Sequence, residues 1–423
     1  MDKIFIIKGD FYDCSENRTL QIRKQCYCIV KDGISLGVYH QIPASFMGAP
    51  LIDYGDALIM PGMIDLHIHA PQYAFRGIGM ELELLEWLYK YTFPEESKFS
   101  SYEYADKAYS LFAKDLKNSP TTRAVIFGTI HREATLCLMR HLEGTGLITE
   151  VGKVNMDRNA PDYYIEDTQE SLRETKKFLE DAALFERTSA ILTPRFIPTC
   201  SDELMAGLGK LQRKTGFRVQ SHLSENRNEI QWVKELCPKA KFYGDAYDQF
   251  GLFGGDCKTI MAHCISSSEE EVELMRERGV FVAHCPNSNI NLSSGIAPIQ
   301  KYLSKGLKVG LGTDLAAGYN ISIFDEMVRA VQVSKMRWRY ISNEEPLTMM
   351  DAFYIATRGG GEFFGRVGSF DAGFEFDALV IDDFDAESQR ELTDEERLFR
   401  SFYLHHECKI KDKYVRGQRI YLD

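Results

Sequence analysis

The sequence lacks long hydrophobic runs. Nowhere in its 423 residues do about 18 uncharged apolar residues follow one another, as a membrane-spanning helix requires. The first apolar run, residues 4–7, already ends at Lys8 and is too short for the core of a secretory signal. We therefore expect a protein that is neither exported nor inserted in a membrane.

Runs of basic residues are also missing. Lysine and arginine total 50 against 62 acidic residues, which gives a formal net charge of −12. A chain with only scattered basic pairs, such as Lys176-Lys177, has no basic surface for phosphate backbones or anionic lipids. The charge pattern therefore predicts that neither nucleic acid nor a membrane is a partner.

The ten cysteines show neither a CxxC pair nor the spacing of a disulfide framework. Most of them lie within apolar stretches, for example Cys137, Cys200 and Cys264, as free thiols do in a reducing compartment. This pattern favours a cytoplasmic protein.

Two β-rich ends flank a region in which strands and helices alternate. Short strand-like runs fill residues 1–60 and return in residues 368–423, so we expect the two ends to form one small β-sandwich subdomain. Residues 61–367 alternate β-rich runs with helical periodicity, which indicates an α/β fold with a parallel sheet, doubly wound or closed as a barrel. Polar residues follow many of these runs. A (β/α)8 TIM barrel gathers strand ends around one point, so we favour it.

The strongest functional signal is the segment PGMIDLHIHA. In it, His67 and His69 are two positions apart on a predicted strand, so their imidazoles point to the same side and can share a metal ion. Two hydrogen-bonded core histidines would give the same pattern, and the pair alone leaves that alternative open.

Other predicted strands also end in metal-binding types of side chain: His222, His263, His284 and Asp314. Each alone has an ordinary explanation, since a strand-end histidine is often part of the core and a strand-end aspartate often caps a helix. A hydrolytic zinc site needs three or four imidazole and carboxylate ligands around one open position. The predicted ligand set is His67, His69, His222 and Asp314.

Two further residues could handle protons beside such a site. Glu225 follows His222 by three residues, where the chain leaves the strand and can fold back over the metal. A first-turn helix carboxylate is the alternative for Glu225. His263, on the next strand, is placed to donate to a developing oxyanion.

In this order the motifs resemble the amidohydrolase superfamily, specifically its mononuclear deaminase branch, over nearly the whole chain. The resemblance implies a distorted (β/α)8 barrel, a β-subdomain from both termini, one zinc or iron ion per subunit, and a homodimer. It implies catalytic roles for Glu225, His263 and Asp314. Members with two metals carry a bridging lysine at the end of strand four, where SAILTPRFIP offers Arg195, so we expect one metal. His284 then has no ligand position to fill and is expected behind the ligands.

Within the branch, the stretches HAPQYAFRG, LTPRFIPTCS and SHLSENRNE resemble members that act on guanine. The chemistry agrees, because Arg195 can donate to a C6 carbonyl and the amide of Gln72 can both donate to and accept from ring nitrogens. Phe196 offers a face for stacking. We therefore expect a small purine as substrate, contacted also by His222 and Glu225, with hydroxide attack at C2. An ordinary loop amide for Gln72 and an ion-paired rim residue for Arg195 are the alternatives.

Two other interpretations stay open. The same chemistry could act on cytosine, adenosine-type nucleosides, pterins or triazines. A metal-free scaffold protein on the same fold is an alternative from a different class, although such proteins usually lose the ligands that this chain keeps. The glycines at 359–361 lack the strand and helix context of a nucleotide loop, so we expect no nucleotide cofactor.

Overall fold

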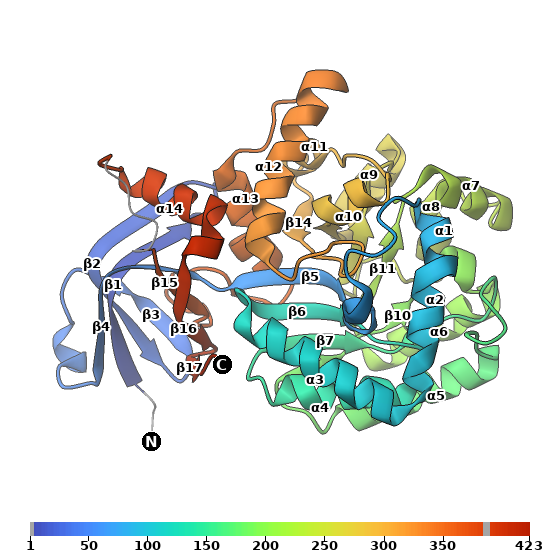
Figure 1. Ribbon diagram of the computed structural model, residues 1–423, viewed down its shortest axis with the longest axis horizontal. Coiled ribbons are helices and arrows are strands. Elements are labelled where there is room, and N and C mark those ends of the chain that lie inside the picture. Colours follow the sequence, from blue (N-terminus) through green and yellow to red (C-terminus); the bar gives the residue numbers. More distant parts are fainter. Residues whose placement is uncertain (1–3, 384–389) are drawn as a thin grey trace.

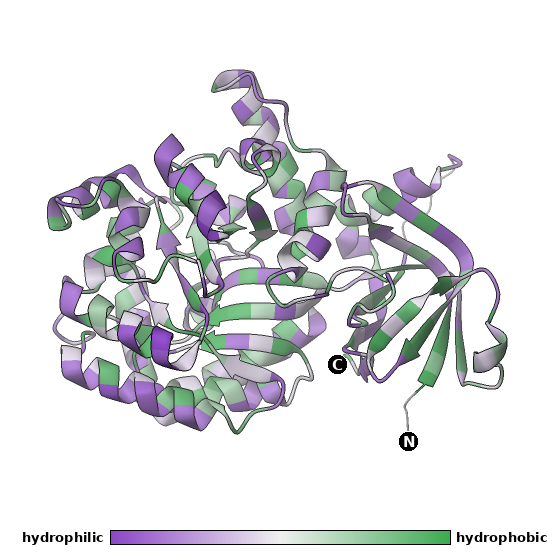
Figure 2. Cartoon of the chain, turned by 180° about the vertical axis from the view of Figure 1, so that it is seen from behind, coloured by the Kyte–Doolittle hydropathy of each residue, from purple (hydrophilic) through white to green (hydrophobic). Residues whose placement is uncertain are grey.

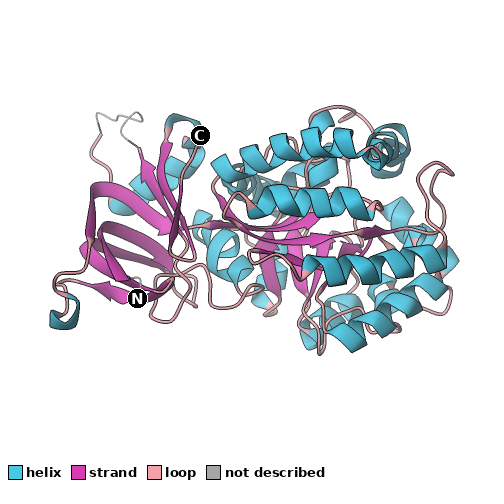
Figure 3. Cartoon of the chain, turned by 90° about the horizontal axis from the view of Figure 1, so that it is seen from below, coloured by secondary structure: helices cyan, strands magenta, loops and turns pink. Residues whose placement is uncertain are grey.

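The computed structural model describes residues 4–383 and 390–423. An all-β part and an α/β part lie side by side (Figure 1). The strands of the α/β part are mostly hydrophobic, and the helices around them carry many hydrophilic residues (Figures 2 and 3). Within the described ranges, no helix combines the length and the apolar character needed to cross a membrane.

Both ends of the chain contribute to one seven-stranded sheet in the order β17-β16-β15-β4-β1-β2-β3 (Figure 1). The strands are β1 (Ile4–Cys14), β2 (Leu20–Lys31), β3 (Ile34–Tyr39), β4 (Leu51–Pro61), β15 (Ala378–Asp382), β16 (Lys409–Val415) and β17 (Gln418–Ile420). Near its middle, β4 runs parallel to β1 and antiparallel to β15. The two ends thus meet in one seven-stranded sheet, and its sandwich form stays a prediction. The domain division at residues 60/61 and 367/368 stays a prediction.

Eight parallel strands form the core of the α/β part, in two four-stranded sheets. The first sheet contains β5 (Met63–His69), β6 (Thr121–Phe127), β7 (Ile148–Gly152) and β9 (Thr188–Ala190). The second contains β11 (Val219–Leu223), β12 (Thr259–His263), β13 (Phe281–His284) and β14 (Lys308–Leu311). A parallel bridge between Leu192 and Val219 joins the two sheets. A short parallel pair, β8 (Val154–Asn155) with β10 (Thr193–Pro194), follows β7 and β9 along the chain.

Helices cover the outside of these strands. They are α3 (Tyr102–Asn118), α4 (Arg132–Glu143), α5 (Thr168–Ala182), α6 (Asp202–Thr215), α7 (Arg227–Leu236), α8 (Tyr243–Asp248), α9 (Glu269–Arg278), α10 (Pro286–Asn291), α11 (Ile299–Ser304), α12 (Ile323–Tyr340) and α13 (Met349–Tyr354). Two short helices, α1 (Leu84–Trp87) and α2 (Phe93–Ser97), lie in the connection from β5 to α3, and α14 (Asp394–Tyr403) packs against α12.

A register shift in β5 turns its paired histidines toward the centre of the barrel. Leu66 packs among the apolar residues inside the barrel, and after the shift between Asp65 and Ile68, His67 faces inward as well. The buried carboxylate of Asp65 accepts hydrogen bonds from the backbone N–H of His67 (3.1 Å) and from the hydroxyl of Thr313 (2.6 Å). Asp65 therefore ties the first barrel strand to the residues that follow the last one.

Candidate active site

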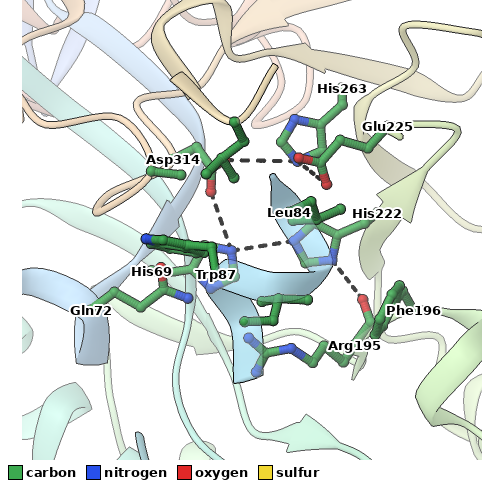
Figure 4. Close-up of a pocket in the computed structure, with 13 residues that line it drawn as sticks. His69, Gln72, Leu84, Trp87, Arg195, Phe196, His222, Glu225, His263 and Asp314 are labelled. Carbon is green, nitrogen blue, oxygen red and sulfur yellow. Dashed lines mark hydrogen bonds and ion pairs between the residues drawn. The ribbon is translucent and has the colours of Figure 1, made fainter. Parts of the chain in front are cut away.

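Three imidazoles, those of His67, His69 and His222, and the carboxylate of Asp314 converge at the carboxyl ends of the barrel strands. Figure 4 shows His69, His222 and Asp314 of this cluster. Nε2 of His69 lies 3.3 Å from Nε2 of His222. Oδ1 of Asp314 lies 3.1 Å from Nε2 of His67 and 3.4 Å from Nε2 of His69. The structure thus brings the four predicted ligand residues into one cluster.

Burial favours the neutral form of the imidazoles in this cluster, which is the form that binds a metal ion. Burial lowers the pKa values of His67, His69 and His222. Nδ1 of His222 donates to the backbone carbonyl of Arg195 at 2.6 Å, so the lone pair of this ring is at Nε2, inside the cluster. Among the described residues, Nδ1 of His67 and Nδ1 of His69 have no hydrogen-bond partner.

The carboxylate of Asp314 is ionised although it is buried. Burial alone would raise its pKa, but the hydrogen bond from His67 and the charges that His67 and His263 carry when protonated outweigh burial and hold that pKa well below its usual range. Neutral imidazole lone pairs around one buried carboxylate are the donor set that zinc prefers among divalent ions. The residues therefore fit the expected metal.

Four residues at the ends of these strands adopt left-handed backbone conformations. The φ angles are 47° for Ser224, 73° for His263, 49° for Cys264 and 46° for Asp314. Such conformations are unfavourable for residues other than glycine and gather at functional sites. Here they accompany the sharp exits from β11, β12 and β14 that turn side chains toward the cluster.

Glu225 lies beside the cluster and is suited to hold a proton. Burial, and after it the charges of Glu229 and Asp314, raise the pKa of Glu225 well above its usual range. Oε2 of Glu225 lies 3.4 Å from Nε2 of His263. Nδ1 of His263 donates to Oδ1 of Asn289 at 2.9 Å, which leaves Nε2 facing Glu225. The two side chains can therefore exchange a proton.

Glu229 fixes the backbone around Glu225. Oε2 of Glu229 accepts the backbone N–H groups of Glu225 (3.0 Å) and Asn226 (3.1 Å), and the hydroxyl of Tyr243 donates to Oε1 (2.7 Å). This arrangement is the capping box that begins α7. The sequence analysis did not identify Glu229, and the Asn226-x-x-Glu229 spacing is the signal that could have revealed it.

We expect Glu229→Gln to change the pH dependence of the reaction. Loss of a negative charge beside Glu225 lowers the pKa of Glu225. Whichever protonation state of Glu225 the reaction needs, the limb of the pH–rate profile that this residue sets should move to lower pH, by about one unit. The measurement is kcat/KM as a function of pH.

Glu326→Gln is the matched control for this prediction. Glu326 is also a buried carboxylate, bonded to Asn287, and it makes no recorded interaction with Glu225. The profile should keep its position in Glu326→Gln. An unmoved profile in Glu229→Gln would restrict Glu229 to capping the helix.

The residues expected to bind substrate line the same cavity as the cluster: Gln72, Arg195, Phe196, His222 and Glu225. A buried carboxylate, Glu96 of α2, organises two of them. Arg195 donates to both oxygens of Glu96, at 2.6 and 3.2 Å, and Nε2 of Gln72 donates to Oε1 of Glu96 at 2.9 Å. The ion pair considered as the alternative for Arg195 is therefore present, and its guanidinium lines the cavity as well.

Both ends of the Gln72 amide have protein partners, since Oε1 accepts the backbone N–H of Ala316 at 3.2 Å. The bonds to Glu96 and Ala316 fix the orientation of the Gln72 amide and leave it one N–H and one lone pair for a ligand. Glu96 is itself held by the hydroxyl of Tyr164, which donates to it at 2.9 Å. Glu96 was not predicted, because nothing in the local sequence FPEES separates it from exposed acidic residues.

Apolar side chains that were not predicted from the sequence complete the cavity: Leu84, Trp87, Leu88, Leu292 and Ala317. Three of these belong to the connection from β5 to α3, in and after α1. His284 is buried but is not among the lining residues, and burial lowers its pKa to about 3.

Comparison with known proteins identifies the family to which this fold and site belong. The family model of the amidohydrolase family matches residues 58–420, and the chain belongs to that family. The barrel type predicted from the sequence is confirmed, although in the described part of the chain no recorded ladder closes β14 onto β5.

Particular relatives are guanine deaminases. The chain is 40% identical to guanine deaminase of Dictyostelium discoideum over 379 residues, covering 88% of this chain and 84% of that protein. It is 41% identical to guanine deaminase of Mus musculus over 376 residues, covering 85% and 82%. The crystal structure of guanine deaminase from C. acetobutylicum, with bound guanine in the active site, matches with a TM-score of 0.95 at 45% identity and covers 99% of this chain and 100% of that chain.

Proposed function

We propose that this enzyme hydrolyses guanine to xanthine and ammonia, with water attacking C2. One observation carries the proposal: the imidazole and carboxylate cluster shares a buried cavity with a guanidinium, an amide and an aromatic ring (Figure 4). The likeness to guanine deaminases, at 40% and 45% identity over most of the chain, supports the same substrate.

The metal in this proposal is zinc or iron, one ion in the catalytic site of each subunit. The residues that would hold it are His67, His69, His222 and Asp314. When bound, zinc acidifies water and so provides a nucleophile near neutral pH. Neutral imidazoles and an ionised Asp314 are the states that such binding requires.

Protons move through carboxyl groups of the chain. Asp314 and Glu225 take the proton of the attacking water, and Glu225 passes it to the ring nitrogen beside C2. The second proton of the water, now on the C2 hydroxyl, passes to the amino group, the C–N bond breaks and ammonia leaves as the C2 carbonyl forms, so guanine and water account for all atoms of xanthine and ammonia.

His263 supports the tetrahedral carbon in this proposal. Its Nε2 lies 3.4 Å from Glu225 and 3.8 Å from Asp314. Because Nδ1 is bonded to Asn289, Nε2 is the ring atom that would donate to the developing oxyanion.

Substrate choice follows from the fixed polar groups. Arg195 donates to the C6 carbonyl, Gln72 pairs with ring nitrogens, and Phe196 stacks on the purine. Adenine presents an amino donor at C6. It would leave the Arg195 N–H groups in the cavity without an acceptor, which costs about 1–3 kcal/mol.

A substrate panel tests the proposal. Ammonia release should be fastest from guanine. It should be about 10²-fold or more slower in kcat/KM from guanosine, adenine, cytosine, a pterin and an amino-triazine, because the polar groups of the cavity match only guanine. Turnover of another member of the panel with guanine untouched would contradict the substrate. A protein that neither holds metal nor deaminates any of them would favour the scaffold alternative.

Cellular location and assembly are part of the same proposal. We place the enzyme in the cytoplasm as a homodimer. All ten cysteines are free and nine are buried, which suits a reducing compartment.

A further inference from the structure

A second group of metal-binding side chains lies far from the catalytic cavity in the chain. The segment HHEC, residues 405–408, places four such side chains in succession. His405 and His406 follow α14 and face Asp325 in the first turn of α12. Nε2 of His405 lies 3.1 Å, and Nε2 of His406 3.9 Å, from the same oxygen, Oδ1 of Asp325.

The two imidazoles and the carboxylate present their polar atoms to one point, with one ligand atom of each residue within 4.8 Å of the others. The contact of 3.1 Å between His405 and Asp325 has the same length as the contact between His67 and Asp314 in the catalytic cluster. Imidazole lone pairs that meet at a carboxylate oxygen fit an ion between them.

Of the residues that the structure describes, no lysine or arginine forms an ion pair with Asp325, although Arg329 lies near enough for its charge to act on this carboxylate. Its other oxygen accepts the side-chain N–H of Asn320. The nearby guanidinium of Arg329 bonds instead to Asn287, Gln332 and Tyr319. Among the described residues, the recorded ion-pair partners of Asp325 are the two histidines alone. A partly buried carboxylate in this situation gains from a bound cation.

The geometry around the group suits an accessible ion. The ring of His405 packs on Phe324, with 5.8 Å between ring centroids, which restrains its orientation. A cavity of about 390 Å³ opens beside His405 and is lined also by Cys408 and Lys409. The exposed side chain of His406 leaves a second approach from solvent. Coordination positions not filled by protein would therefore be open to water.

A third cluster in the chain has the same kinds of residue but needs no ion. Nε2 of His141 lies 2.8 Å from Oδ1 of Asp106 with hydrogen-bond alignment, and Sγ of Cys137 donates to the same oxygen. The polar groups there satisfy one another. This cluster, Asp106, Cys137 and His141, supplies a control.

We propose that Asp325, His405 and His406 form a second metal site, specific for divalent transition-metal ions such as zinc. Two imidazoles and one carboxylate match the ligand preference of these ions and not that of magnesium or calcium. A bound ion would join the turn after α14 to the start of α12. It would thereby fasten the C-terminal part of the chain to the helix that follows the cavity residue Ala317.

The test is a zinc count on the full-length protein. Chelator-treated protein is titrated with ZnCl₂ against a chromophoric chelator, and bound zinc is also measured by elemental analysis. The wild-type chain should bind two ions and the His405→Ala/His406→Ala variant one. Asp325→Asn alone should weaken the second ion about tenfold or more, because loss of a direct ligand costs at least as much as loss of an outer partner.

His141→Ala should still bind two ions, whereas His67→Ala should lose the other ion and keep the one at Asp325. The difference of one ion between wild type and the double variant does not depend on the substrate or on activity, so it stands apart from the proposed function. Three outcomes would overturn the proposal: a double variant that binds as many ions as wild type, a second ion lost in His141→Ala instead, or magnesium binding as tightly as zinc. Circular dichroism spectra and melting temperatures verify that each variant is folded.

Discussion

Glu225→Gln should keep the metal and lower turnover of guanine by about 10²–10⁴ or more. Glutamine has the shape of glutamate and can still accept the bond from Ser294, but it cannot carry a proton between water and the purine. The raised pKa and the position beside His263 make Glu225 the residue best placed for that transfer. Steady-state kinetics and elemental analysis on the same preparation provide both readouts.

Ligand variants give the contrast for this experiment. His67→Ala and His222→Ala should lose metal as well as activity, because each removes a neutral imidazole from the cluster. Metal content therefore separates residues that bind from residues that move protons. If Glu225→Gln turned guanine over at the wild-type rate, proton transfer would belong to Asp314 or His263.

Arg195→Ala should lower kcat/KM for guanine by about 10²-fold or more while the metal stays bound. A charge-assisted hydrogen bond to the C6 oxygen is worth about 1.5–3 kcal/mol, and its loss also misplaces C2 relative to the attacking water. Arg195→Lys should recover only part of the loss, because a compact ammonium cannot reproduce the planar fork that spans Glu96.

The control for Arg195→Ala must take account of Glu96, the ion-pair partner of Arg195. Removal of Arg195 alone leaves a buried carboxylate without its counter-charge, which destabilises a fold by about 3–5 kcal/mol. Arg195→Ala combined with Glu96→Gln removes that charge. The double variant should regain thermal stability but not activity on guanine. Full activity in Arg195→Ala would make Arg195 a structural residue and leave recognition to Gln72 and Phe196.

The four ligand residues could be predicted from the sequence because each lies in a short motif at the end of a predicted strand. His67 and His69 follow one apolar run, and His222 and Asp314 each end another. The parallel arrangement of the strands does the rest, since it gathers their carboxyl ends in space. One feature of these ligands could not be predicted from the sequence. Side chains alternate along a regular strand, so the adjacent residues Leu66 and His67 should face opposite sides. Both face inward because of the register shift in β5.

The supporting carboxylate of Glu96 could not be predicted in this way. Glu96 meets Arg195 across 99 positions of the chain, and only the packing of α2 over the barrel brings them together. Its neighbour Glu95 bonds instead to Lys98 and Tyr104. Two adjacent glutamates with such different surroundings look alike in a sequence. Trp87 was missed for the same reason, because an apolar residue of a short helix carries no mark of the cavity it lines.

The seven-stranded sheet combines strands from both ends of the chain, which are synthesised at different times. During synthesis, β4 leaves the ribosome before any barrel strand, whereas its partner β15 follows the last of them. Until then β4 presents a row of unpaired N–H and C=O groups, which is the kind of edge that recruits strands from other chains. The nascent protein therefore completes its barrel with an open sheet beside it, and crowding of neighbouring nascent chains is most hazardous during that interval.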